Sequence, residues 1–210
     1  MSWGGMRGVR LAALLTLLAL PVQAQSSIEN AALCNGSDPD AAIQGCTAMI
    51  VGSNGDKKSL AEIYTNRAVA QRNKGMPDQA IADLTKAIEL SPAEAIPYYD
   101  RGAVYIGQGS YDLAVADLSE AIVRSGNYED AYYARGLVYA RLHRYDLAVA
   151  DFSRVIVLKP DQVRGYLGRG LAFAGLGQRQ RAIGDFNAAL KIDPDNRNAR
   201  DYLGHLGVGS

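Results

Sequence analysis

The sequence repeats with a period of 34 residues over its central and C-terminal part. An aromatic column recurs at this interval in Tyr64, Tyr98, Tyr132 and Tyr166. A column of small residues follows in Ala80, Ala114, Ala148 and Ala182, and a column of large apolar residues in Leu84, Leu118, Phe152 and Phe186. A fixed period of this length indicates stacked units, because each unit is too small to bury its apolar face alone.

Each 34-residue repeat is expected to contain two helices joined by a short turn. In the first repeat, Ile63 and Tyr64 lie four and three residues before Arg67, on one helical face. The turns are expected at Gly75, Gly109, His143 and Gly177. Because proline cannot continue a helix and glycine often ends one, the second helices are expected to end near Pro92, Gly126, Pro160 and Pro194.

This order of aromatic, small, large apolar and proline positions resembles the tetratricopeptide repeat (TPR), from Ala61 to Asn196. The resemblance implies an all-α fold, an α-solenoid of four helix-turn-helix repeats that form a right-handed superhelix. The repeats would span 61–94, 95–128, 129–162 and 163–196. One capping helix is expected within the N-terminal segment 25–60 and another at 197–206, followed by a disordered tail at 207–210.

Two charged columns depart from the family pattern. Each repeat has an arginine in its first helix and an aspartate in its second: Arg67 and Asp83, Arg101 and Asp117, Arg135 and Asp151, and Arg169 and Asp185. Because half-buried charges are normally paired, we interpret these residues as structural Arg–Asp pairs that bridge the two helices of each repeat. The alternative is a repeated charge array that binds a ligand or takes part in catalysis.

Residues 1–24 have the three parts of a secretory signal peptide. Arg7 and Arg10 supply positive charge, the stretch from Leu11 to Leu20 is apolar, and small residues precede a cleavage site after Ala24. This apolar stretch is too short to cross a bilayer, which needs about 20 residues. We therefore expect export to a bacterial periplasm, or secretion, with no stable membrane anchor after cleavage. The alternative is a buried N-terminal helix.

Both cysteines, Cys34 and Cys46, lie in the N-terminal segment. An even number of cysteines in an exported chain indicates a disulfide, and two free buried thiols are the alternative. Their spacing is not that of a CxxC redox motif, and no histidine lies nearby to complete a zinc site. Ser37-Asp38-Pro39 indicates the start of a helix from Pro39 to Val51. This segment is similar to the opening of small exported bacterial TPR proteins.

The resemblance implies that a partner binds on the concave surface, which the first helix of each repeat lines. The lining residues expected from the repeat are Thr65, Val69, Arg72, Tyr99, Ala103, Ile106, Tyr133, Leu137, Ala140, Leu167, Leu171 and Ala174. Most are apolar, so the surface suits a peptide strand or an amphipathic helix. Asn66 is followed in its column by Asp100, Ala134 and Gly168, so a clamp for a terminal carboxylate is not expected. The alternative for any one lining residue is packing between helices.

No enzyme signature is present, because the sequence lacks HExxH, GxSxG and P-loop motifs. The two histidines, His143 and His205, have no nearby nucleophile. Lysine plus arginine and aspartate plus glutamate both total 22, so no excess of basic residues points to nucleic acid. We therefore expect a protein-binding adaptor or scaffold without catalytic residues, metal or cofactor. The alternatives are a self-associating homo-oligomer and a regulatory subunit of an envelope protease or peptidoglycan hydrolase.

Overall fold

The structure is a computed structural model that describes residues 22–53 and 55–208. Every regular element in this range is an α-helix, which confirms the expected fold class. The first 21 residues of the expected signal peptide lie outside the described range. The first described helix, α2 (Val22–Cys34), begins just before the expected cleavage site after Ala24.

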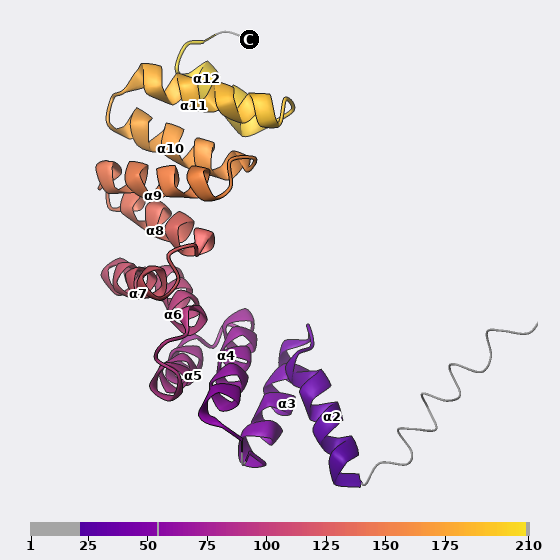
Figure 1. Cartoon of the computed structure of the whole chain (residues 1–210). Helices are drawn as coiled ribbons and strands as arrows, with labels where there is room; N and C mark the ends of the chain where they lie inside the picture. The colour runs from indigo at the N-terminus through magenta and orange to yellow at the C-terminus, as the bar shows by residue number, and fades with distance from the viewer. Residues whose placement is uncertain (1–21, 54, 209–210) are drawn as a thin grey trace, which may run out of the picture. The chain divides into compact units, whose positions relative to one another are not determined.

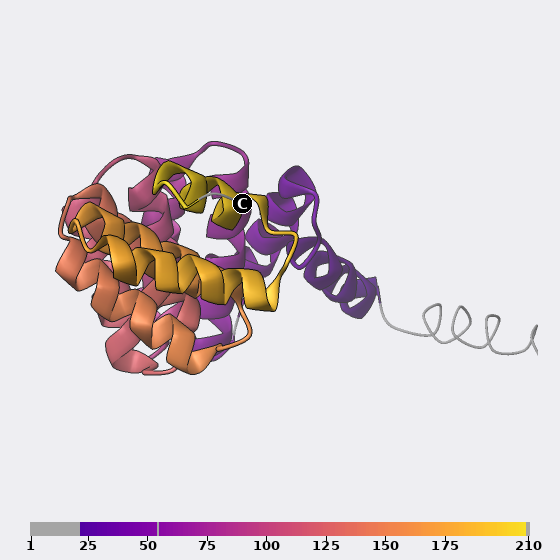
Figure 2. The same cartoon turned by 90° about the horizontal axis from the view of Figure 1, so that it is seen from above.

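The chain divides into two compact units between Leu90 and Ser91. The helices of unit 1 are α2, α3 (Pro39–Val51), α4 (Lys57–Asn73) and α5 (Pro77–Leu90). The helices of unit 2 are α6 (Ala95–Gly107), α7 (Tyr111–Arg124), α8 (Glu129–Arg141), α9 (Tyr145–Leu158), α10 (Val163–Gly175), α11 (Arg179–Ile192) and α12 (Arg197–His205). Within each unit, every helix packs on the next one along the chain (Figure 1). In unit 2, α9, α10 and α11 lie one above another in Figure 1 and overlap when they are seen from above in Figure 2, as stacked helix pairs do.

The turns between α4 and α5, α6 and α7, α8 and α9, and α10 and α11 are Schellman motifs, which confirms the expected turn positions. Gly75, Gly109 and Gly177 have φ of 76°, 74° and 71°, and His143 takes the same left-handed conformation with φ of 57°. In each turn the following residue donates its backbone N–H to the carbonyl five residues back, as from Met76 to Gln71 over 2.9 Å. These bonds satisfy carbonyls that the helix end would otherwise leave without a partner.

The small and large apolar columns interlock between the paired helices. The four alanines of the small column and the four residues of the large apolar column are buried. A Cβ at Gly136 would lie 3.0 Å from the Phe152 ring, and a Cβ at Gly168 would lie 2.6 Å from the same ring. Phe152 therefore fills the space that two glycines leave, one in the first helix of its own pair and one in the next pair.

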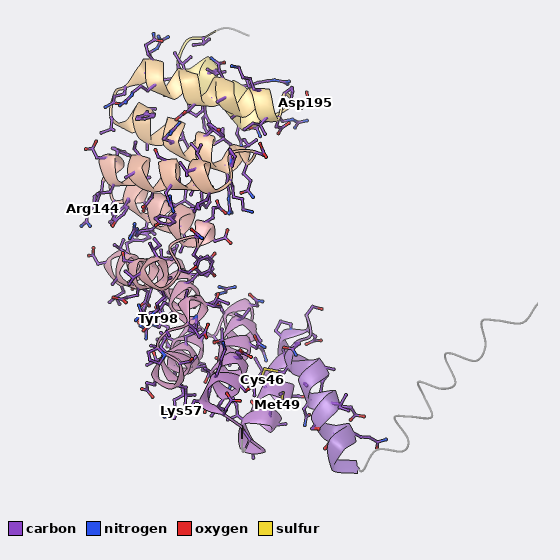
Figure 3. The ribbon with its side chains drawn as sticks, in the orientation of Figure 1. Cys46, Met49, Lys57, Tyr98, Arg144 and Asp195 are labelled. Carbon is purple, nitrogen blue, oxygen red and sulfur yellow. A yellow bond between two sulfur atoms is a disulfide. The ribbon has the colours of Figure 1, made fainter. Side chains whose placement is uncertain are left out.

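The helix expected from Pro39 to Val51 is present as α3, but it has a partner that the sequence analysis missed. α2 packs directly on α3, and a Cβ at Gly45 would lie 2.6 Å from the Asn30 carbonyl oxygen. The buried disulfide Cys34–Cys46 joins the same two helices, so the expected disulfide is confirmed. It is the yellow bond beside the Cys46 label in Figure 3. The N-terminal segment is therefore a disulfide-bonded helix pair, not a lone cap.

One helix limit and part of the C-terminal tail differ from the expected ones. α4 begins at Lys57, before the expected repeat limit of 61, because the Asp56 side chain accepts a hydrogen bond from the Ser59 backbone over 3.0 Å and so caps the helix. The expected disordered tail is wrong for its first two residues. Gly207 is left-handed with φ of 68°, and Val208 donates to the Leu203 carbonyl over 3.0 Å and packs on the core around Phe186. The remaining residues, 209–210, lie outside the described range.

Candidate functional site

The expected lining residues of unit 2 lie on the first helices of three successive repeats, α6, α8 and α10, each of which contacts the next. Leu137 of α8 and Leu171 of α10 occupy equivalent positions in successive repeats and are 46% and 43% exposed. The other expected lining residues of unit 2, Tyr99, Ala103, Ile106, Tyr133, Ala140, Leu167 and Ala174, are partly exposed. The helices therefore bring together a surface of apolar side chains that are within reach of a ligand.

Ile96 adds to this surface and was missed by the sequence analysis. It lies in the first turn of α6 and is 54% exposed. It precedes Tyr99 by three residues, so the two side chains share one face of the helix. The equivalent positions in the next two repeats hold the charged residues Asp130 and Arg164. The repeat pattern therefore did not indicate an apolar surface residue at position 96.

The two tyrosines of this surface are held by aromatic neighbours. The Tyr99 ring lies 4.9 Å from the Tyr128 ring, centroid to centroid, and the Tyr133 ring meets the Phe152 ring edge-on at 5.7 Å. Burial raises the pKa of Tyr133, and burial together with the nearby Asp100 charge raises the pKa of Tyr128. The hydroxyls of Tyr133 and Tyr128 therefore stay protonated at neutral pH and present neutral hydrogen-bonding groups beside apolar rings.

An ion cluster lies at the start of α8 and α10, next to the apolar surface. Arg164 bonds to Glu129, with its Nε 3.0 Å from Oε1, and also to Asp130 over 2.5 Å. The guanidinium also lies 4.8 Å above the centre of the Tyr133 ring. Asp130 and Arg164 stand 34 residues apart, so the repeat could have indicated that they meet. Because this cation already serves two carboxylates, it is a poor site for a ligand carboxylate.

In unit 1 the structure separates the expected lining residues. Thr65 is only 7% exposed, and its hydroxyl donates to the Ala61 carbonyl of its own helix over 2.8 Å. Its assignment to the binding surface is therefore wrong, since a short hydroxyl side chain at this depth is satisfied by its own helix. Val69 and Arg72 are partly exposed, and Val69 lines a cavity of about 350 Å³. The cavity lies between α4 and the segment that connects α2 to α3.

Each arginine of the repeated Arg–Asp column bonds to its aspartate through two contacts. The nitrogen–oxygen distances are 2.7 and 2.8 Å in the first two pairs and 2.8 Å in the last two. The four aspartates are buried, and hydrogen bonding to them raises the pKa of each arginine. These contacts favour the framework interpretation over a ligand-binding charge array.

A hydroxyl completes several of these arginine sites and was not expected from the sequence. Arg135 donates to Ser119 over 2.8 Å, and Arg169 donates to Ser153 over 3.2 Å. Each serine belongs to the second helix of the preceding pair. In unit 1 Arg67 donates in the same way to Thr47 of α3 over 3.0 Å. The sequence signal was a column of hydroxyl residues at the repeat interval, Thr85, Ser119 and Ser153.

Neither histidine has the surroundings of a catalytic group. His143 and His205 are exposed, and the His143 Nδ1 atom lies 2.8 Å from the Tyr145 hydroxyl beside its turn. Across residues 22–53 and 55–208, no three His, Cys, Asp or Glu side chains gather as metal ligands would. In the same part of the chain, no helix has both the length and the apolar character needed to cross a bilayer.

Comparisons with known proteins agree with the repeat geometry. One tetratricopeptide-repeat family model matches residues 136–201, and a second matches residues 61–93. The chain is a TPR protein. TPR proteins are generally non-catalytic modules for protein–protein interaction. The family therefore supports a role for this chain in protein–protein interaction. The comparison with curated proteins gives no match.

Several solved TPR structures resemble the chain. A crystal structure of MamA is 29% identical, covers 75% of this chain and 90% of its own, and has a TM-score of 0.68. MamA from Desulfovibrio magneticus RS-1 is 26% identical, covers 74% of this chain and 86% of its own, and has a TM-score of 0.67. YrrB, described as a TPR protein with an unusual peptide-binding site, is 18% identical, covers 93% and 96%, and has a TM-score of 0.70. At that identity the likeness to YrrB shows the fold alone.

Proposed function

We propose that unit 2 binds a polypeptide segment across the inner faces of α6, α8 and α10. The observation that carries this proposal is the exposure of Leu137 and Leu171 at equivalent positions of two helices in contact. A repeat protein normally places polar residues where no neighbour covers them, so large apolar side chains that recur on an open face suggest a ligand surface. If the two leucines only packed between neighbouring helices, they would be buried. Both are instead exposed.

The chemistry of this surface favours an apolar segment over a charged one. Ile96, Leu137 and Leu171 supply apolar area, and the packed rings of Tyr99 and Tyr133 add area that costs little conformational entropy to immobilise. The adjacent Arg164 is engaged by Glu129 and Asp130, so a clamp for a terminal carboxylate is not supported. The side chains of an extended strand or one face of an amphipathic helix would fit this surface.

We also propose that the protein acts after export, as an adaptor or scaffold in the bacterial periplasm. The sequence of residues 1–24 supports this proposal through its charged, apolar and small-residue regions. The Cys34–Cys46 disulfide supports it independently, because structural disulfides persist in oxidising compartments. Fusing residues 1–24 to alkaline phosphatase, which is active only after export, tests the location. An inactive fusion would contradict it.

A peptide selected from a random display library against the full chain tests the binding site. We expect backbone amide resonances of α6, α8 and α10 to move when the selected peptide is added to ¹⁵N-labelled protein. The matched comparison is the outer surface of α7 and α9, where Val123 and Val157 are 78% and 69% exposed. Resonance shifts confined to α7 and α9 would contradict the assignment of the binding surface.

Self-association is a second candidate, and the exposed residues of α7 and α9 favour it. Leu113 and Val123 of α7 recur as Leu147 and Val157 of α9, and all four are exposed. Apolar side chains that recur on an outer face can form an interface between copies. Light scattering during size exclusion decides this candidate. A dimer that Val123→Asp with Val157→Asp dissociates would support it, and a monomer at all concentrations would exclude it.

A further inference from the structure

The cavity in unit 1 is a concave site that is lined on one side by the disulfide-bonded end of α2. Its walls are Cys34 at the end of α2, the connecting residues Asn35, Gly36 and Ser37, and the helices α3 and α4. Its volume of about 350 Å³ is within the range of small-ligand sites. All of its lining residues belong to unit 1. The cavity is therefore complete without any residue of unit 2.

The polar lining of this cavity does not follow from the repeat. Asn66 and Asn73 of α4 both line it. In the later repeats the Asn66 column holds Asp, Ala and Gly, and the Asn73 column holds Gly107, Arg141 and Gly175. The two carboxamides are thus particular to the first repeat. Asn66 Nδ2 donates to Asn35 Oδ1 over 2.9 Å, so a third carboxamide from the connecting segment joins them.

The lining selects against charge. None of the ten residues around the cavity carries a formal charge. Charged residues that neighbour the lining in sequence are engaged elsewhere: Asp40 pairs with Lys74, the Asp38 carboxylate caps α3, and Arg67 pairs with Asp83. A charged ligand group would lose part of its hydration against this lining and find no partner of opposite sign among the ten residues. The lining therefore favours a neutral ligand part.

The remaining lining distinguishes between neutral ligands. Val69, Ala42 and Ala70 form an apolar part of the wall, which suits a small or medium apolar side chain. No aromatic residue is among the ten, so a sugar ring would find no face on which to stack. A carboxamide offers both a donor and an acceptor, and a peptide group requires one of each. This pattern favours a peptide over a saccharide.

We propose that the cavity binds one uncharged residue of a polypeptide, with its main-chain amide on the asparagines and its side chain against Val69. This inference extends the proposed polypeptide binding to unit 1 and rests on it. It adds a specific requirement, since an acidic or basic residue at the same ligand position would be rejected. The disulfide holds the connecting segment that carries Asn35 and Ser37, so the cavity wall depends on the oxidised chain.

Side-chain amide NMR of the full, oxidised chain tests the proposal. The probe is the blocked peptide acetyl-Ala-Ala-Leu-Ala-Ala-amide, whose termini carry no charge. We expect it to move the side-chain amide resonances of Asn35, Asn66 and Asn73 together and to saturation. Peptides with Asp or Lys in place of the central Leu should bind about tenfold more weakly, because their charge has no partner in the cavity.

Two variants sharpen this test. Asn66→Asp places a charge in the cavity, and the second repeat has Asp100 in that column, so an α-helix of this fold accepts the residue. It should weaken binding of the Leu peptide about tenfold. Glu62→Gln changes an exposed residue on α4 that does not line the cavity, and should leave binding unchanged.

Several outcomes would overturn the proposal. One is the absence of any shift at the three asparagines at the solubility limit of the Leu peptide. Another is equal binding of the Leu, Asp and Lys peptides, and a third is the same set of shifts with chitotriose but not with the peptide. Shifts confined to α6, α8 and α10 would reject this cavity while leaving the proposed function of unit 2 intact.

Discussion

Arg135 and Asp151 join α8 to α9 through two parallel contacts, in which the Nε and Nη2 atoms of Arg135 donate to the two carboxylate oxygens over 2.8 Å each. The same guanidinium donates to Ser119 of α7 over 2.8 Å. One side chain therefore links three helices from two successive pairs. This arrangement makes the repeated arginine a framework residue and leaves the apolar inner face as the candidate for ligand binding.

Arg135→Leu should lower the free energy of unfolding by about 3 kcal/mol, because it leaves the buried Asp151 carboxylate without its partner. Urea denaturation followed by circular dichroism measures this change. Arg144→Leu is the matched control. Arg144 and Asp112 are both exposed and 3.7 Å apart, so its loss should cost less than about 1 kcal/mol. Equal effects of the two variants would show that the Arg135 pair contributes no more than a surface ion pair.

Gly168→Ala should destabilise unit 2 by about 1–3 kcal/mol, because the new methyl group would lie 2.6 Å from the Phe152 ring. The control is Gly184→Ala in α11, where the new methyl group meets nothing within 4 Å. That change should stabilise the protein by about 0.5–1 kcal/mol through the higher helix propensity of alanine. Thermal unfolding should show shifts of opposite sign. Shifts of the same sign would contradict the close approach of α9 and α10.

Replacing both cysteines, as in Cys34→Ser with Cys46→Ser, should lower the stability of unit 1 by about 3 kcal/mol in the chain-entropy model. Hydrogen exchange should localise the loss of protection to α2 and α3, since the disulfide joins these helices. A reducing agent should produce the same change in the wild-type chain and none in the variant. Unaltered exchange in α2 would mean that its packing on α3 suffices without the covalent link.

The repeat made much of the fold predictable because each helix pair packs mainly on its sequence neighbours. One register therefore specified the turns at Gly75 and His143, the buried alanine and phenylalanine columns, and the Arg–Asp contacts. The confirmation of His143 is informative, since a non-glycine residue in a left-handed turn is uncommon. Its place in the column, rather than its own propensity, predicted its conformation.

The features that the sequence did not reveal depend on contacts that do not recur. The position of α2 depends on the close approach at Gly45 and on one disulfide, neither of which has an equivalent in the repeats. Thr65 shares a column with Tyr99 and Tyr133, yet its small side chain bonds to its own helix instead of lining a surface. The asparagine cavity requires Asn35 from outside the repeats. Periodicity carries no information about such contacts.

The central claim is that the apolar inner face of unit 2 binds a polypeptide. Its most direct test is the affinity of a library-selected peptide, measured by calorimetry for the wild type, for Leu137→Ser with Leu171→Ser, and for Val123→Ser with Val157→Ser. We expect the leucine pair to weaken binding about tenfold to a hundredfold, since burial of the exposed half of each leucine contributes about 0.7–1.4 kcal/mol. The valine pair is more exposed but lies on α7 and α9, outside the proposed binding surface, so its replacement should leave the affinity unchanged. Unchanged affinity of the leucine pair, or a loss with the valine pair, would contradict the claim.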